Sequence, residues 1–281
     1  MIDYVGGLED LRAGVVRSIG DPDVRLNEDP VRMLRAIAIA ARLDFTIEPT
    51  LLDAIRTHCH EISKSSMARL LEEYYKILRA GSAERAFRGL AEVGLLEPIS
   101  KELHLGATDP LWQSLAALDA YRGQFESTPE TLTNAILLGS LLIPLGISLH
   151  PSRGPNQGSE SVTRVGGRRH PPIPRLGDLP LARRDIERLR QVIGLQRRLK
   201  DLSASPRAQR ALAHRHIFRD ALTWMEIHSG ATETVEHWKA LLAEAGPADV
   251  PPVEGGGVQP ASSGRRRRRR RRGRRFSPPQ G

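Results

Sequence analysis

Apolar residues recur every three or four positions along most of the chain, which is the spacing of one face of an α-helix. Ser66 and Ser82 are suited to cap two of these helices, and Gly81 and Gly94 are suited to end them. The segments with this pattern are residues 49–58, 66–81, 82–94, 112–121, 131–145, 182–202, 209–228 and 232–245. No segment has the alternating apolar and polar pattern of a strand, and no repeat of fixed period is found. We therefore predict an all-α fold.

Two segments depart from this helical pattern. Residues 151–180 are rich in Pro, Gly, Ser and Arg, and we predict a flexible linker there. Residues 246–281 contain ten arginines against two carboxylates, and eight of these arginines are consecutive. Such a run repels itself, so we predict a disordered tail. Most of the net charge of +9 lies in this tail, and the rest of the chain is nearly neutral.

Composition narrows the class of protein. With 281 residues the chain is long enough to bury a core in one or two domains. Cys59 is the only cysteine, which excludes an internal disulfide and fits the reducing cytosol, so we expect a cytoplasmic protein. The most apolar stretch, residues 137–145, is short and interrupted by Gly139 and Pro144, so no membrane span is predicted. No secretory signal is visible.

The most informative segment surrounds Asp29. Asn27 is suited to cap a helix that has Pro30 in its first turn. Asp29, Arg32 and Arg35 then follow one another at intervals of three and share one helix face. The segment therefore predicts a carboxylate and two guanidinium groups close together.

Such a face can read the edge of a nucleobase. Adenine and cytosine both present an amino donor beside a ring-nitrogen acceptor, and guanine and uracil present the reverse. If Asp29 accepts from the amino group and Arg32 donates to the ring nitrogen, the pair accepts A and C and rejects G and U. A wrong base would leave buried polar groups unpaired, at about 1–3 kcal/mol each. Arg35 can reach a phosphate, which suits its planar fork.

The same spacing has a purely structural interpretation. Glu28 and Asp29 would lie at the positive end of the helix dipole, where carboxylates are stabilising. Arg32 would then form an ordinary i,i+4 pair with Glu28, worth about 0.2–0.5 kcal/mol. On spacing alone this interpretation is the more frequent outcome.

Three motifs in one order carry a resemblance to a known family. They are DYVGGLEDL at residues 3–11, RSIGDP at 17–22 and EDPVRMLRA at 28–36. Together they resemble the class II nucleotidyltransferases, which include bacterial poly(A) polymerases and CCA-adding tRNA nucleotidyltransferases. The resemblance continues to LAEVGLL at residues 90–96. It implies that Asp29 and Arg32 are the base-reading pair of a helical neck domain, and that Arg35 contacts the nucleotide.

One departure from the family pattern affects this region. The family continues Arg-Ala-x-Arg-Phe-Ala-x-Arg, whereas residues 35–42 are RAIAIAAR. Ala38 therefore replaces an arginine, and Ile39 replaces an aromatic residue. A phosphate or RNA contact that the family makes through that arginine is not expected at Ala38.

The family's catalytic head precedes the neck, and its Asp-x-Asp pair holds two metal ions for phosphoryl transfer. This chain starts at Met1 where that head should end, so we expect the catalytic carboxylates to be absent and the isolated chain to be inactive. Mg²⁺ would be held by the head of the complete enzyme, or by a head on a separate polypeptide. Asp21-Pro22-Asp23 has the Asp-x-Asp spelling, but Gly20 and Pro22 predict a turn rather than a metal site.

The resemblance and the composition together predict a division of the chain into segments. These are a remnant of the head–neck junction at 1–24, the nucleotide-reading and RNA-binding neck at 25–98, a helical body at 99–150, the linker at 151–180, a C-terminal helical RNA-binding region at 181–245 and the basic tail at 246–281. A basic helix over residues 183–198 can contact RNA phosphates, or can simply be an exposed solubilising face.

The tail is predicted to bind RNA without sequence preference. Neutralising phosphates releases counterions, with a log–log salt slope of about −0.7 per phosphate on single strands. The residues concerned are Arg265, Arg266, Arg267, Arg268, Arg269, Arg270, Arg271, Arg272, Arg274 and Arg275.

His58 and His60 suggest a metal site only superficially, because side chains two positions apart on a helix face different ways.

The function implied by the resemblance is addition of AMP from ATP to the 3′ ends of mRNA or tRNA without a template. The arginine-rich tail favours poly(A) polymerase, because a non-specific electrostatic tether suits many different RNAs. CCA addition stays open, since those enzymes read A and C with the same pair. A non-catalytic RNA-binding protein derived from this family is the third possibility.

Overall fold

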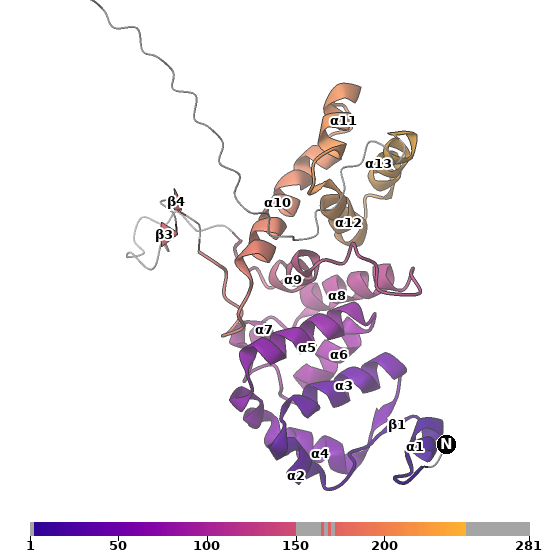
Figure 1. The fold of residues 1–281 in the computed structure, drawn as a ribbon, viewed down its shortest axis with the longest axis vertical. Helices are drawn as coiled ribbons and strands as arrows, with labels where there is room; N and C mark the ends of the chain where they lie inside the picture. Colours follow the sequence, from indigo (N-terminus) through magenta and orange to yellow (C-terminus); the bar gives the residue numbers. More distant parts are fainter. Residues whose placement is uncertain (1–2, 150–163, 166–167, 170–171, 246–281) are drawn as a thin grey trace, which may run out of the picture. The chain divides into compact units, whose positions relative to one another are not determined.

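The computed structural model describes residues 3–149, 164–165, 168–169 and 172–245, and these are mostly helical (Figure 1). The helices are α1 Gly7–Ala13, α2 Pro22–Glu28, α3 Val31–Leu43, α4 Pro49–His58, α5 Met67–Arg79, α6 Ala83–Glu92, α7 Lys101–Leu105, α8 Asp109–Arg122, α9 Asn134–Leu142, α10 Arg183–Lys200, α11 Pro206–Ala213, α12 Phe218–His228 and α13 Thr232–Ala245. A 3₁₀ helix, η1 Cys59–Lys64, connects α4 to the loop before α5. The predicted all-α fold is confirmed.

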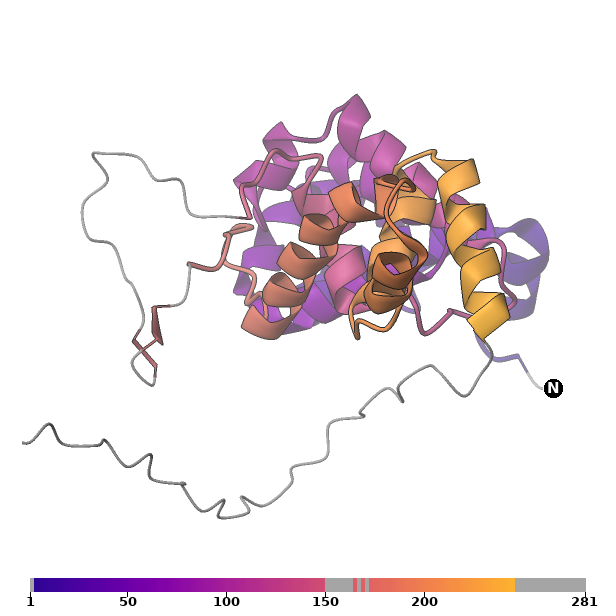
Figure 2. The same cartoon turned by 90° about the horizontal axis from the view of Figure 1, so that it is seen from above.

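Contacts divide the chain into Met1–Val250, which contains every described residue, and Pro251–Gly281. Within the first unit, α3 packs on α5 and α6, α6 packs on α8, and α8 packs on α9 and α12. Figure 2 shows the orange and yellow helices α10–α13 grouped together, and α10 contacts both α9 and α12. One continuous apolar core runs through these helices. The predicted boundaries between neck, body and C-terminal region stay predictions.

The starts of α5 and α6 show how the free backbone N–H groups at a helix N-terminus can find hydrogen-bond acceptors. Ser66 and Ser82 are the N-cap residues of α5 and α6 as predicted, but neither side chain makes a capping hydrogen bond. Instead, Asp119 of α8 accepts hydrogen bonds from the backbone N–H groups of Ala83 (2.7 Å) and Glu84 (2.9 Å). Burial raises the pKa of Asp119. A partly buried carboxylate thus caps α6 from a neighbouring helix and fixes its position against α8.

The expected helix start at Asn27 is wrong. Asn27 lies inside α2, and its side-chain amide donates to the backbone carbonyl of Asp23 (2.8 Å). The chain leaves the helix at Asp29, which has φ −144° and ψ 93°, because a residue before proline disfavours the helical conformation. The next helix, α3, begins at Val31. Asp29 therefore lies in the bend between two helices.

The predicted turn at Asp21-Pro22-Asp23 is also wrong, because this segment starts α2. Asp21 is the N-cap, its carboxylate accepts from the backbone N–H of Asp23 (2.9 Å), and Pro22 is the first helical residue. A proline is well suited to that position, since its missing N–H would have no intrahelical partner there.

Two short pairings were not predicted from the sequence. The strand β1 (Val15–Val16) pairs in parallel with β2 (Thr46–Ile47), and β3 (Arg164–Val165) pairs antiparallel with β4 (Arg168–Arg169). Strands of two residues are too short to show an alternating pattern. The predicted helix over residues 209–228 is likewise divided into α11 and α12 by a turn in which the N–H of Phe218 bonds to the carbonyl of Arg215 (2.9 Å).

The predicted linker extends too far. Residues 172–181 pack on the helices, with Leu176, Leu179 and Leu181 buried. The N–H of Gly177 donates to the Glu102 carboxylate (2.9 Å). Three buried leucines give this segment enough apolar contact to hold it in place. Residues 150–163, 166–167 and 170–171 of the predicted linker, and the whole basic tail, lie outside the described residues.

Candidate functional site

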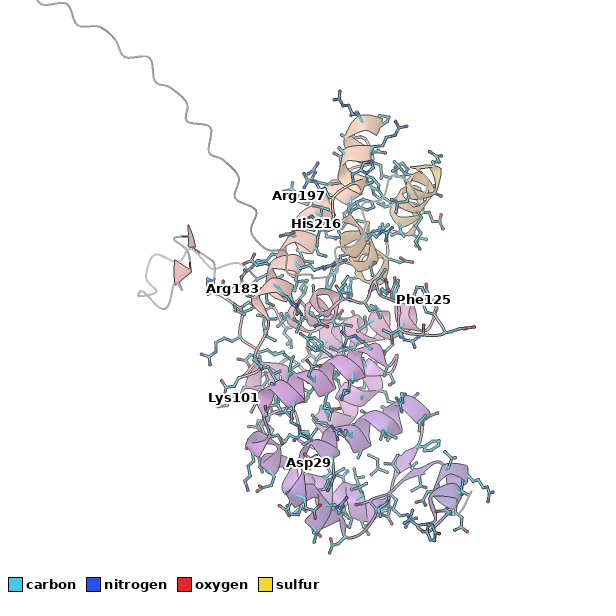
Figure 3. All side chains as sticks on the ribbon, viewed as in Figure 1. Asp29, Lys101, Phe125, Arg183, Arg197 and His216 are labelled. Carbon is cyan, nitrogen blue, oxygen red and sulfur yellow. The ribbon has the colours of Figure 1, made fainter. Side chains whose placement is uncertain are left out.

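Asp29 lies in the bend between α2 and α3 (Figure 3). Its carboxylate accepts a hydrogen bond from the backbone N–H of Val31 (3.3 Å), at the first residue of α3. Both oxygens also lie near Nη2 of Arg69 on α5, at 3.3 and 3.1 Å. The side chain is 24% exposed. Asp29 is thus fixed by α3 and α5 and keeps one side open to solvent.

Arg32 is anchored by one of its terminal nitrogens. Nη1 donates to the Glu28 carboxylate (3.0 Å) and to the backbone carbonyl of Arg25 (2.7 Å). The hydrogen bond from Arg32, assisted by the charge of Arg25, lowers the pKa of Glu28. The i,i+4 pair of the structural interpretation is therefore present. The backbone N–H of Arg32 donates to the carbonyl of Asp29 (3.0 Å), but no hydrogen bond joins the side chains of these two described residues. Among the described residues, Nε and Nη2 of Arg32 have no hydrogen-bond partner.

Arg35 meets a carboxylate on α5. Its Nε and Nη2 both donate to the same oxygen of Glu73, at 3.1 and 2.7 Å, and Lys76 Nζ donates to that oxygen as well (3.0 Å). The Glu73 side chain is only 10% exposed. Burial tends to raise its pKa, but the hydrogen bonds from Arg35 and Lys76 outweigh burial and lower it. Glu73 is consequently ionised and holds both cations.

The α5 residues were missed in the sequence. Arg69, Glu73 and Lys76 follow one another at intervals of four and three, which places them on one face of α5, alongside Asp29 and Arg35. Their spacing can be read from the sequence, but charged residues with this spacing usually form the solvent-exposed face of a helix. Only the packing of α5 against α3 shows that this face meets the predicted site.

Asp29 and Arg32 are both held by protein groups and keep hydrogen-bonding capacity in reserve. Asp29 and Arg32 each use part of their hydrogen-bonding capacity on a protein group and keep an acceptor and a donor for something else. Holding these groups before a ligand arrives lowers the entropy cost of binding. A carboxylate acceptor and a guanidinium donor are the kinds of group that complement the amino group and the ring nitrogen of adenine or cytosine.

A second set of residues carries unpaired positive charge. On α10–α12 and their connections, these exposed cations have no carboxylate partner among the described residues: Arg197, Arg198, Lys200, Arg207, Arg210, Arg215 and Arg219. We call them the C-terminal basic set. Figure 3 labels Arg197 on α10 and His216 in the turn between α11 and α12. Arg188 and Arg190 differ, since they pair with Asp220 and with Glu187.

The described part of the chain contains no group of three or more His, Cys, Asp or Glu side chains that could hold a metal ion. His58 pairs with Asp23 (2.7 Å). Cys59, the next residue in the sequence, is buried. None of the described helices is both long and apolar enough to cross a membrane. The tail arginines predicted to bind RNA lie outside the described residues.

Two family models match the sequence. One is described as the probable RNA- and SrmB-binding site of polymerase A and matches residues 44–105. The other is described as the arginine-rich C-terminus of polymerase A and matches residues 175–275. Together they cover more than half of the chain. The first contains the α5 face that holds Asp29 and Arg35, and the second contains the C-terminal basic set.

Curated relatives match the N-terminal part. Poly(A) polymerase I of Salmonella typhi is 43% identical over 97 residues, which are 34% of this chain and 21% of that protein. The CCA-adding enzyme of Bacillus licheniformis is 36% identical over 99 residues, or 35% of this chain and 25% of that enzyme. The matched region thus spans about a quarter or less of either relative.

Solved structures extend the likeness over most of the fold. The CCA-adding enzyme of Bacillus stearothermophilus in complex with CTP has a TM-score of 0.57 at 22% identity, covering 86% of this chain and 54% of that one. The Thermotoga maritima CCA-adding enzyme complexed with tRNA has a TM-score of 0.52 at 18% identity, covering 93% and 60%. At these identities the likeness shows the fold alone. The family models, the curated relatives and the fold agree: the chain belongs to the nucleotidyltransferase family of bacterial poly(A) polymerases and CCA-adding enzymes.

Proposed function

We propose that this chain is the nucleotide-reading and RNA-binding part of an enzyme that adds AMP from ATP to RNA 3′ ends without a template. The observation that carries the proposal is the preorganised pair of Asp29 and Arg32 in the bend between α2 and α3. Asp29 accepts from the amino group of the incoming base, and Arg32 donates to its ring nitrogen. Arg35, held by Glu73, contacts the nucleotide beyond the base.

Phosphoryl transfer in this family needs Mg²⁺, and the described residues do not fit a metal site. No described residue is therefore proposed to hold Mg²⁺. The work of the described residues is to select the base, to hold the nucleotide and to bind RNA.

Polyadenylation is favoured over CCA addition by two findings. Identity is higher to poly(A) polymerase I than to the CCA-adding enzyme, at 43% against 36%. The arginine-rich C-terminal model of polymerase A also matches residues 175–275. CCA addition is the second candidate, because the similar solved structures are CCA-adding enzymes and the base-reading pair accepts both A and C.

RNA is the proposed macromolecular partner. The C-terminal basic set offers cations that no described carboxylate neutralises, and the arginine run at 265–272 adds charge. Binding of such cations to a phosphate backbone is driven by counterion release and does not depend on sequence. This suits an enzyme that acts on many RNAs.

The test is an extension assay on a chimera that joins this chain to the catalytic head of a poly(A) polymerase I. With a labelled RNA primer, Mg²⁺ and single nucleotides, we expect long products with ATP, weak incorporation of CTP and none of GTP or UTP. Products that stop after C, C and A on a tRNA primer would instead assign CCA addition. Equal use of all four nucleotides would contradict the proposed base selection.

A further inference from the structure

The contact between α3 and α5 holds a cavity whose lining begins at Arg35. The two helices lie side by side (Figure 1). Asp29, just before α3, pairs with Arg69 of α5, and Arg35 of α3 pairs with Glu73 of α5. The cavity between the helices has a volume of 170 Å³. Ala38 of α3 and Ala80, the residue that follows α5, line it, and these small side chains leave it open. We call this cavity the α3–α5 groove.

Positive charge dominates the lining of this groove. Arg35, Arg42 and Lys76 contribute three cations, and Glu73 contributes the one carboxylate among its lining residues. Arg42 is exposed and has no hydrogen-bond or ion-pair partner among the described residues. Glu73 cannot neutralise all three, because its buried oxygen is already shared by Arg35 and Lys76.

The cations keep hydrogen-bonding capacity for a ligand. Lys76 donates one hydrogen bond to Glu73, which leaves two of its three N–H groups, and its side chain is 65% exposed. Arg35 uses Nε and Nη2 on Glu73 and keeps Nη1. Charged residues that merely keep a helix surface soluble do not require a cavity between them, and they do not require a buried carboxylate shared by two cations. Cations converging on an open cavity are suited to phosphate.

We propose that the α3–α5 groove is a phosphate-binding site in which Lys76 of α5 and Arg42 of α3 contact the phosphate. The phosphate belongs to the incoming nucleotide or to the last internucleotide linkage of the RNA 3′ end. Lys76 of α5 and Ala38 of α3 line the same groove. Lys76 therefore supplies a positive charge beside the position at which α3 has alanine in place of the family's arginine. This site extends the proposed nucleotide-binding function and rests on it.

Lysine acylation followed by mass spectrometry tests this site in the full chain. The chain has five lysines, Lys64, Lys76, Lys101, Lys200 and Lys239, and the arginine-rich tail has none, so ligand bound to the tail does not disturb the readout. The probes are inorganic tripolyphosphate, ATP, GTP and a short single-stranded RNA. We expect the acylation rate of Lys76 to fall at least threefold with one of these probes, while Lys64 and Lys101 react as before.

The probes separate the two sources of phosphate. Protection by tripolyphosphate and by nucleotides assigns the groove to the nucleotide, and protection by RNA alone assigns it to the RNA end. Arg42→Gln should raise the probe concentration needed for half-protection at least threefold. Arg56→Gln on α4 is the matched control, because Arg56 is also exposed and, in the described part of the chain, has an ion pair with Asp53 alone at 3.5 Å. This variant should leave the half-protection concentration unchanged.

Two outcomes separate failure of this site from failure of the proposed function. If RNA protects Lys200 of the C-terminal basic set but no probe protects Lys76, the groove assignment is overturned and RNA binding stands. If ATP and GTP protect Lys76 equally, the phosphate site stands and base selection by Asp29 and Arg32 is contradicted. Equal half-protection concentrations in Arg42→Gln and the unaltered chain would remove Arg42 from the site.

Discussion

Replacement of Arg32 by alanine is expected to lower kcat/KM for ATP by about 10- to 100-fold in the chimera with a catalytic head. A hydrogen bond to a charged group contributes about 1.5–3 kcal/mol, and each 1.4 kcal/mol is about tenfold. The preference for ATP over GTP should fall as well, because the alanine neither donates to the adenine ring nitrogen nor opposes the guanine ring N–H. Steady-state extension with each nucleotide measures both effects.

Arg25→Ala is the matched control for this experiment. Arg25 pairs with the same Glu28 carboxylate as Arg32, at 2.6 Å, and its backbone carbonyl still anchors Arg32 in the variant. We therefore expect Arg25→Ala to keep the nucleotide preference. If Arg32→Ala also kept it and merely lowered stability, Arg32 would be only a partner of Glu28, as in the structural interpretation of the motif.

The second large effect concerns stability in mild acid. His228 lies at the end of α12, its ring is 4.1 Å from that of Trp224, and its Nε2 is 3.0 Å from the Ser140 hydroxyl. Burial lowers the pKa of His228 from 6.5 to about 4. The unfolded chain therefore takes up this proton at a higher pH than the folded chain. Stability is lost as pH falls from 6.5 to 4, by about 3 kcal/mol at about 1.4 kcal/mol per pKa unit.

Urea unfolding at pH 7 and at pH 4.5, followed by tryptophan fluorescence, measures this loss. The variant His228→Gln keeps a side-chain amide near Ser140 but does not titrate. It should be less stable at pH 7 and lose less free energy of unfolding on acidification than the unaltered chain. Carboxylates titrate in both proteins, so the difference between them isolates His228. Equal losses in the two proteins would show that burial does not govern this histidine.

The sequence predicted the helices well where local signals are strong. The segments over 49–58, 66–81 and 82–94 correspond to α4, α5 and α6, because periodicity and glycine stops act within a few residues. The pairing of β1 with β2 is a contact between distant residues and left no local pattern. The break at Asp29 was misplaced, although Pro30 supplied the signal for it.

The candidate site was predicted only in part. Asp29, Arg32 and Arg35 were identified from a short motif, but the groups that hold them were not. Arg69, Glu73 and Lys76 act on the site through the packing of α5 against α3, and the sequence alone does not tell which face of α5 meets α3. The unpaired cations of α10–α12 were also indistinguishable from paired ones such as Arg188 until the structure placed Asp220.

The most direct measurement is a crystal structure of the chimera with bound ATP. We expect the adenine amino group to lie within about 3 Å of the Asp29 carboxylate, and the adenine ring nitrogen to lie at a similar distance from the free nitrogens of Arg32. Adenine bound elsewhere, with Asp29 bonded only to Arg69 and Arg32 bonded only to Glu28 and the Arg25 carbonyl, would contradict this expectation.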